Sequence, residues 1–227
     1  MRNLIVTGLM MLTLAGGAVL SVHAQTPAMQ PGVSVQMAVT TGAAQLPDAD
    51  NPDAWVVTIT ANGHLYFGQD SETPESLLQA MKNRPRNRGQ ALYVKADSRA
   101  PFASVKQVLE AAHALFDRAY LLTAQPTGAQ PGSVVPPTGL PISIAAAPTA
   151  GAVVVYISPG EGSPKLRIAN EDVPLKTLQR KLVELLPSPN DRVVLLKAGQ
   201  VPFADVVHVV DECNMAGAVT VVGSAEL

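Results

Sequence analysis

Runs of apolar residues along residues 54–124 predict a small unit of strands and helices. The expected elements are, in chain order, a strand over 55–60, a strand over 65–67, a helix over 73–83, a strand over 91–96, a helix after Pro101 and a strand over 119–122. The Asn62-Gly63 pair between the first two strands is typical of a hairpin turn, because both residue types accept positive φ. Thr73 is suited to cap the first helix, and Pro74 to occupy its first position.

The same order of elements is expected again in residues 151–224. Strand patterns cover 153–157, 166–168 and 193–198, and helices are expected from Pro174 and from Pro202. In both stretches a Lys-Ala pair ends the third strand, at Lys95 and at Lys197, and Pro-Phe-Ala follows shortly after. Because the shared residues recur at the same place in the same order, the pattern indicates an internal repeat.

We therefore predict an α+β fold of two tandem ββαβαβ modules, each a mixed sheet with two helices on one face. The predicted boundaries are a tether with a leading strand over 25–53, a first module over 54–124, a Pro-rich linker with a leading strand over 125–150 and a second module over 151–224. The leading strands are apolar islands at 33–39 and 140–144. The face of each sheet without helices has to be covered by the other module, by the leading strands or by another protein.

The first 24 residues indicate export. Arg2 is followed by an uncharged stretch from Leu4 to Leu20 and by small residues ending at Ala24, which is the pattern of a cleaved signal peptide. The alternative is an uncleaved membrane anchor, since the stretch approaches the length that spans a bilayer. We expect a periplasmic protein, with membrane contact only if this segment is retained.

Composition and charge exclude several function classes. The formal net charge is −2, so the chain lacks the basic character expected of a nucleic-acid-binding protein. A single cysteine, Cys213, rules out an internal disulfide and lies on an apolar helical stripe, which favours a buried thiol over a nucleophile. The four histidines show no spacing that would build a zinc site. No catalytic residue, cofactor or metal is predicted.

These residues resemble the periplasmic domain of the ExbD/TolR family, small subunits of proton-driven complexes in bacterial envelopes. The resemblance rests on Leu46-Pro47, Asn62-Gly63, the helix from Thr73, Val94-Lys95-Ala96-Asp97 and Pro101-Phe102, and in the second module on Lys197-Ala198, the run over 202–211 and the ending over 214–222. It implies pairing of modules, contact with peptidoglycan and binding of energy-transducing partners. The family's proton-carrying membrane carboxylate has no counterpart between Leu4 and Val22, so ion translocation is not implied.

The loops that lead from a strand into a helix carry the first candidate binding residues. In the first module these are Asp97, Pro101 and Phe102, and in the second Pro202 and Phe203. Strand ends are common docking places in α/β folds, which makes these residues candidates for partner binding. Pro also fits the first turn of a helix and Phe a core position, and the recurrence of the pair in both modules favours this structural role, so Asp97 is the better functional candidate. Gly199 stands where the first module has Asp97.

A basic run after the first helix supplies the second set of candidates, Arg84, Arg86 and Arg88. These side chains are suited to the carboxylates of peptidoglycan or of an acidic partner. A solvated loop near a helix C-terminus explains the charges as well. The second module lacks the run, so the charge is not part of the shared scaffold.

The sequence therefore predicts a non-enzymatic periplasmic binding or scaffold protein, accessory to biopolymer transport of the TonB or Tol type. The alternative is a structural protein that binds peptidoglycan through two tethered modules. An enzyme acting at the strand-end loops is a third interpretation, for which no convergent acid, base or nucleophile is evident. The expected partner is an envelope protein or peptidoglycan and not nucleic acid, and we expect the modules to pair within the chain or as a homodimer.

Overall fold

A computed structural model describes residues 32–83, 91–126, 136–144, 151–188 and 192–222, and all of them lie in one unit, Pro31–Leu227. The predicted signal peptide and the three arginines of the basic run lie outside the described residues. None of the helices described is long and apolar enough to cross a membrane.

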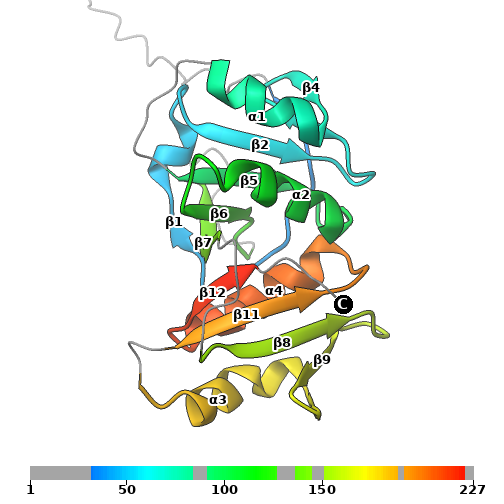
Figure 1. Ribbon diagram of the computed structural model, residues 1–227, viewed down its shortest axis with the longest axis vertical. Coiled ribbons are helices and arrows are strands. Elements are labelled where there is room, and N and C mark those ends of the chain that lie inside the picture. The colour runs from blue at the N-terminus through cyan, green and yellow to red at the C-terminus, as the bar shows by residue number, and fades with distance from the viewer. Residues whose placement is uncertain (1–31, 84–90, 127–135, 145–150, 189–191, 223–227) are drawn as a thin grey trace, which may run out of the picture. The chain divides into compact units, whose positions relative to one another are not determined.

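The first module contains three strands, a helix, a strand, a second helix and a closing strand (Figure 1). In chain order these are β2 (Trp55–Ile59), β3 (Leu65–Phe67), β4 (Asp70–Glu72), α1 (Pro74–Asn83), β5 (Leu92–Ala96), α2 (Phe102–Ala112) and β6 (Arg118–Thr123). The expected hairpin is present, with Gly63 at φ 83°. The Thr73 hydroxyl accepts a hydrogen bond from the Ser76 N–H at 3.2 Å, which caps the start of α1 as expected.

The second module repeats this order of elements. In chain order these are β8 (Val153–Ser158), β9 (Lys165–Ile168), β10 (Glu171–Val173), α3 (Leu175–Leu185), β11 (Val193–Ala198), α4 (Phe203–Met215) and β12 (Val219–Val222). Arg192 joins its two helices at their C-terminal ends. The guanidinium donates to the carbonyls of Leu186, Ala216 and Pro187 at 2.6, 2.7 and 3.2 Å, so one cation satisfies carbonyls that the helix ends leave free.

One twelve-stranded mixed sheet runs through both modules in the order β10-β9-β8-β11-β12-β7-β6-β5-β2-β3-β4. The central strand β7 (Thr138–Ser143) comes from the apolar island before the second module, where a leading strand was predicted. It pairs parallel with β12 and antiparallel with six residues of β6, and thereby joins the modules. The short strand β1 (Ala44–Gln45) pairs with β7 off this path. The α+β class with a mixed sheet is confirmed.

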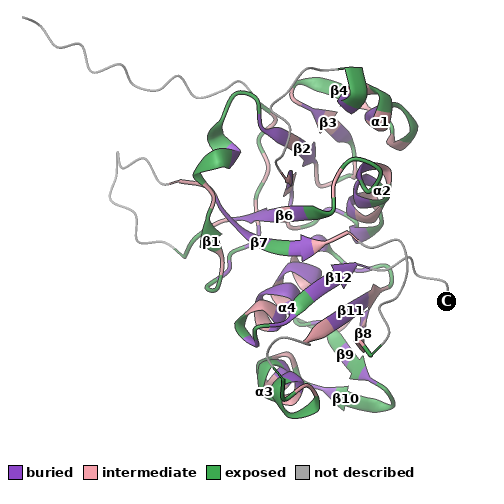
Figure 2. Ribbon diagram, turned by 60° about the vertical axis from the view of Figure 1, so that its left-hand side comes forward, coloured by how far each residue is buried: buried purple, intermediate pink, exposed green. Residues whose placement is uncertain are grey.

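The two backbones approach closely where β6 and β7 pair. A Cβ built on Gly139 of β7 would lie 2.8 Å from the carbonyl oxygen of Leu121 in β6, so only glycine fits there without a shift. Figure 2 shows mainly buried residues in β6 near the middle of the sheet and mainly exposed residues in β10 at its edge. Acidic side chains on β4 and β10 suit such edges, because charge opposes pairing with a further strand.

A continuous apolar core lies between the sheet and the helices. It includes the fully buried Phe67, Leu77, Leu182 and Phe203, and the ring of Trp55 stacks on that of Phe67 at a centroid distance of 5.8 Å. A smaller cluster covers the opposite face of the first module, where Ala49, Ala54, Tyr93 and Leu122 pack together with partly buried neighbours that include Met37 and Leu46. Residues before the first module therefore cover its helix-free face.

Two features differ from the sequence-based expectation. The strand predicted over 33–39 is not formed apart from one parallel bridge between Val39 and Ala124. Its backbone groups bond instead to loop residues and to a side-chain carboxylate, which a hydrophobic pattern does not report. The strands β4 and β10 were not expected, because three mostly polar residues at a sheet edge carry no apolar alternation.

Candidate functional site

Asp97 follows β5 and is buried, with 5% of its side chain exposed. Its carboxylate accepts hydrogen bonds from the backbone N–H groups of Gln36 and Arg99 at 3.1 and 3.0 Å, and from the Arg99 guanidinium at 2.9 and 3.1 Å. The Arg99 guanidinium, helped by the two backbone N–H groups, holds the pKa of this carboxyl well below its usual range. The charge of Asp97 therefore serves to anchor residues near Gln36.

The loops before α2 and α4, which were predicted as candidate sites, meet each other. Pro101 and Pro202 form an antiparallel bridge. Phe102 N–H donates to the Val201 carbonyl at 3.0 Å, and Phe203 N–H donates to the Ala100 carbonyl at 2.8 Å. The two modules are thus bonded to each other at equivalent positions.

The side chains of the two loops differ in exposure. Phe102 and Phe203 are 2% and 0% exposed and belong to the apolar core, whereas Pro101 and Pro202 remain exposed. In this arrangement the phenyl rings contribute to packing. The prolines are the part of each loop that solvent reaches.

Residues 33–42, here called the strap, run across the first module and reach the second. The Gln36 carbonyl accepts from Ser98 N–H at 2.7 Å, and Thr40 N–H donates to the Ala124 carbonyl at 3.1 Å. At the end of the strap the Asp211 carboxylate on α4 accepts from the N–H groups of Thr41 and Gly42 at 3.1 and 3.0 Å. Two buried carboxylates, one in each module, therefore hold the strap.

Asp211 was missed by sequence reasoning. The signal for it was an acidic residue inside the apolar run of the last helix, two positions before Cys213. Gly42 supplies a second signal, since a Cβ there would lie 2.7 Å from an Asp211 carboxylate oxygen. Both signals gain meaning only once the strap and α4 are known to be neighbours.

A row of side chains crosses the first-module sheet on its helix-free face, and the strap covers one end of this row. The row consists of register neighbours on β4, β3, β2 and β5, namely Ser71, Tyr66, Thr58 and Lys95. The Lys95 ammonium donates to the Val33 carbonyl at 3.2 Å. An extended piece of chain is therefore held on this face through its backbone, by Lys95 and by Asp97.

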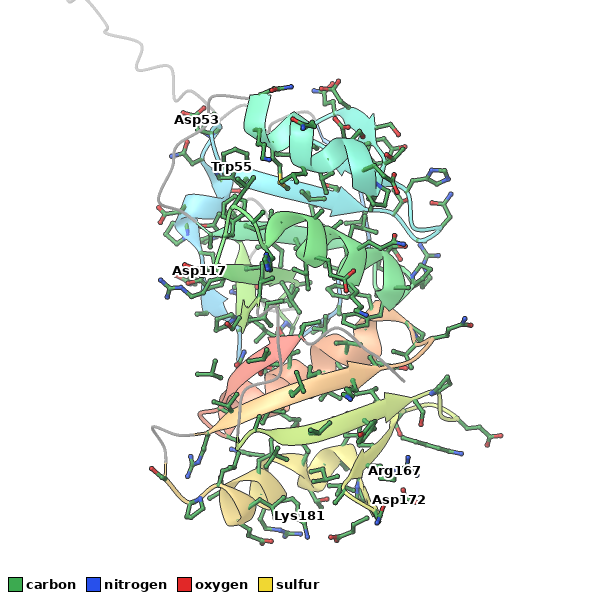
Figure 3. All side chains as sticks on the ribbon, in the orientation of Figure 1. Asp53, Trp55, Asp117, Arg167, Asp172 and Lys181 are labelled. Carbon is green, nitrogen blue, oxygen red and sulfur yellow. The ribbon has the colours of Figure 1, made fainter. Side chains whose placement is uncertain are left out.

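At the equivalent place the second module has a hollow of about 320 Å³. The hollow is the concavity lined by Tyr156, Ser158, Lys165, Arg167, Asp172, Lys197 and their neighbours on β8, β9, β10 and β11. Figure 3 shows Arg167 and Asp172 beside each other on the outer strands of this module. The volume is at the lower end of the range for ligand pockets.

A row of side chains equivalent to the row of the first module forms the floor of the hollow. Its members are register neighbours on four adjacent strands, namely Asp172, Arg167, Tyr156 and Lys197. Val155 and Ile157 point into the helix-covered core, so Tyr156 between them points to the other face. The Arg167 guanidinium and the Lys197 ammonium each lie 5.8 Å from the centre of the Tyr156 ring, within range of a cation–π contact.

Metal-binding side chains do not gather in the described part of the chain. Cys213 is fully buried, as expected, and burial raises the pKa of its thiol to about 12. Across the described ranges no group of three or more His, Cys, Asp and Glu side chains is placed to hold a metal ion. The hollow, a concavity lined by an aromatic ring and charged side chains, is suited to hold a ligand.

Comparison with protein families gives one match. Residues 19–127 match the family described as Biopolymer transport protein ExbD/TolR. The first module is an ExbD/TolR-like domain. The match spans the strap and the whole first module, and ends before β7 and the second module. No curated protein and no solved structure matches the chain.

Proposed function

We propose that this protein is a non-enzymatic binding module of the bacterial cell envelope, accessory to biopolymer transport, and that its second module holds an extended segment of a partner protein in the hollow. The ExbD/TolR match supports the relation to biopolymer transport. The second module is proposed to be a divergent copy of the same domain. The equal order of elements and the equal register around Lys95 and Lys197 support that proposal.

One observation carries the proposal: the first module already binds an extended segment at the equivalent place. There the strap contributes backbone groups, a carbonyl to Lys95 and an N–H to Asp97. Backbone recognition of this kind accepts varied sequences and is a common way for a sheet to bind a peptide. The hollow keeps the lysine, as Lys197, and has no described segment bonded to its ammonium.

The absence of catalysis is part of the proposal. The carboxylate of Asp97 is fully used in hydrogen bonds, and the raised pKa of Cys213 keeps its thiol protonated. Neither group is positioned to act on a bound ligand. A periplasmic location with residues 1–24 removed as a signal peptide is also proposed, on the sequence pattern alone.

Peptidoglycan is a second candidate partner, favoured by the cations of the hollow. Its stem peptides are short, extended and carry carboxylates, which Lys165, Arg167 and Lys197 are suited to bind. The three arginines of the basic run would add to such binding. A protein partner remains the first proposal, because the strap that serves as the template is itself a polypeptide.

Site-specific photo-crosslinking in the native envelope tests the proposal. A photoreactive phenylalanine analogue replaces Tyr156 in the floor of the hollow, and in a matched control it replaces Val183, which is 40% exposed on α3. We expect an adduct with an envelope protein from position 156 and none from position 183. Adducts with cell-wall fragments would favour the second candidate. The same adducts from both positions, or none from either, would refute a binding role of the hollow.

A further inference from the structure

The hollow carries positive charge that the described residues leave unpaired. Lys165, Arg167 and Lys197 line it together with one carboxylate, Asp172. None of these four side chains forms an ion pair with a described residue. Cations crowded around one ring repel each other, so the arrangement is costly unless an anion joins it.

The side chains at the equivalent positions of the first module carry a different set of charges. By register, the second module has Lys165 in place of His64, Arg167 in place of Tyr66, Asp172 in place of Ser71 and Gly199 in place of Asp97. It therefore gains a lysine, an arginine and a carboxylate on its outer strand, and loses the carboxylate that follows the lysine-bearing strand. In the first module the carboxylate of Asp97 is the anion next to the bound strap. In the second module the one carboxylate of the hollow, Asp172, lies on the outer strand beyond Arg167, so an anion between Arg167 and Lys197 has to come from the ligand.

The strap shows which ligand side chains would face the floor. Val33, Val35 and Met37 are half-buried, whereas Ser34 and Gln36 between them are exposed. Alternate residues of an extended segment point to opposite sides. Residues 33, 35 and 37 of the strap therefore face the sheet. A ligand bound in the same way would present every second side chain to the row that includes Arg167 and Lys197.

We propose that the hollow selects an extended segment of a partner protein that carries an acidic side chain at a sheet-facing position, with its carboxylate between Arg167 and Lys197. This inference rests on the proposed function and specifies its ligand. The Tyr156 ring keeps the two cations on either side of it, and each retains N–H groups for the incoming carboxylate. Apolar neighbours of the acidic residue pack on the ring face.

Three capped synthetic peptides with the sequence of residues 33–40 test the selection. One has the native sequence, one carries Glu in place of Val35, which faces the sheet, and one carries Glu in place of Gln36, which faces away. The two acidic peptides have the same charge and length. In calorimetric titrations of the full chain we expect the Val35→Glu peptide to bind about tenfold more tightly than the other two. Equal affinities of the two acidic peptides would overturn the inference.

Protein variants locate the binding. Arg167→Gln combined with Lys197→Gln is expected to remove the advantage of the Val35→Glu peptide, whereas Lys176→Gln, which removes an exposed lysine from α3, is expected to keep it. If the advantage persists in the double variant, the peptide binds elsewhere and the inference is wrong.

Gly199→Asp restores the carboxylate that the first module has at this position. A Cβ there meets only the Ile157 carbonyl oxygen at 3.8 Å, so the variant is expected to fold. The new carboxylate should neutralise Lys197 and lower the affinity for the Val35→Glu peptide about tenfold, while the isosteric Gly199→Asn should not.

A failure of this inference is distinguishable from a failure of the proposed function. Crosslinking at position 156 to a partner without an acidic sheet-facing residue would refute the selection and leave the binding role intact. Absence of any crosslink would refute both.

Discussion

Replacing Asp97 by Asn should release the strap from the first module and lower the free energy of unfolding by about 2–3 kcal/mol. The carboxylate accepts from donors at both oxygens, Gln36 N–H and Arg99 Nη2 at one, Arg99 N–H and Nε at the other. An amide has a single acceptor oxygen, so in either orientation its NH₂ group faces an N–H donor. The variant loses one charge-assisted bond to a backbone N–H, worth about 1.5–3 kcal/mol, and leaves that donor unsatisfied.

The control is Arg99→Gln. The guanidinium is largely exposed, with 68% of the Arg99 side chain accessible, so water screens its ion pair with the buried Asp97 carboxylate and limits what the pair contributes to stability. This variant keeps both backbone bonds to Asp97. Urea unfolding gives the free energies, and hydrogen exchange of the Gln36 amide reports the release of the strap directly. The reasoning would be refuted if Arg99→Gln were as destabilising as Asp97→Asn, or if both the Gln36 and the Arg99 amides stayed protected in Asp97→Asn.

The same carboxylate gives a prediction for pH. Its pKa is lowered in the folded protein, chiefly by the Arg99 guanidinium, so the native state binds fewer protons there than the unfolded state. The stabilisation is fully present above the unfolded pKa of about 3.9 and is lost as the pH falls towards the folded value. The stability difference between wild type and Asp97→Asn should therefore shrink as the pH is lowered from about 6 towards 3. A constant difference over that range would show that the charge of Asp97 is not responsible.

Three further changes test the packing. Arg192→Ala removes three bonds to carbonyls at the ends of α3 and α4 and should cost about 2–4 kcal/mol in urea unfolding, with Arg192→Lys recovering part of the loss. Gly139→Val should cost about 1–3 kcal/mol by forcing β7 from β6, whereas Gly199→Ala, whose Cβ makes only an ordinary contact with the Ile157 carbonyl oxygen, should be nearly neutral in the same assay. The Cys213 thiol should resist a disulfide reagent in the native state at mildly alkaline pH and react once denaturant unfolds the chain, because burial raises its pKa to about 12; rapid reaction of the native protein would contradict its burial.

The regular elements were predictable because each has a local cause. Apolar periodicity predicted the strands that became β2, β5, β8 and β11, and the Asn62-Gly63 pair and the Thr73 cap fixed a turn and a helix start. The island over 140–144 became β7 for the same reason. The strap has no such cause. It is held by carboxylates 61 and about 170 residues away along the chain, and one sequence does not reveal which distant side chain takes which backbone N–H.

The hollow was partly readable from the sequence. Lys165 and Arg167 alternate with apolar residues, which places both on the exposed face of their strand, and Lys197 repeats Lys95. The meeting of Arg167 and Lys197 around Tyr156 depends on the register between β8, β9 and β11. A shift of one residue would send every side chain of a strand to the other face. Register depends on the loop geometry and the packing of the whole core, so the site could not be assembled before the fold.

The charged row in the second module also admits a plain structural explanation, since charges on an open sheet face keep it soluble. Solubility, however, is best served by interspersed charges of both signs. Here two cations lie over one ring, and a third cation lines the same hollow with a single carboxylate. The two modules share a lysine at one register position, Lys95 and Lys197, and in the first module this lysine donates to a backbone carbonyl of the strap. A solubilising lysine has no reason to occupy that register position in both modules, whereas a lysine that binds an extended chain does.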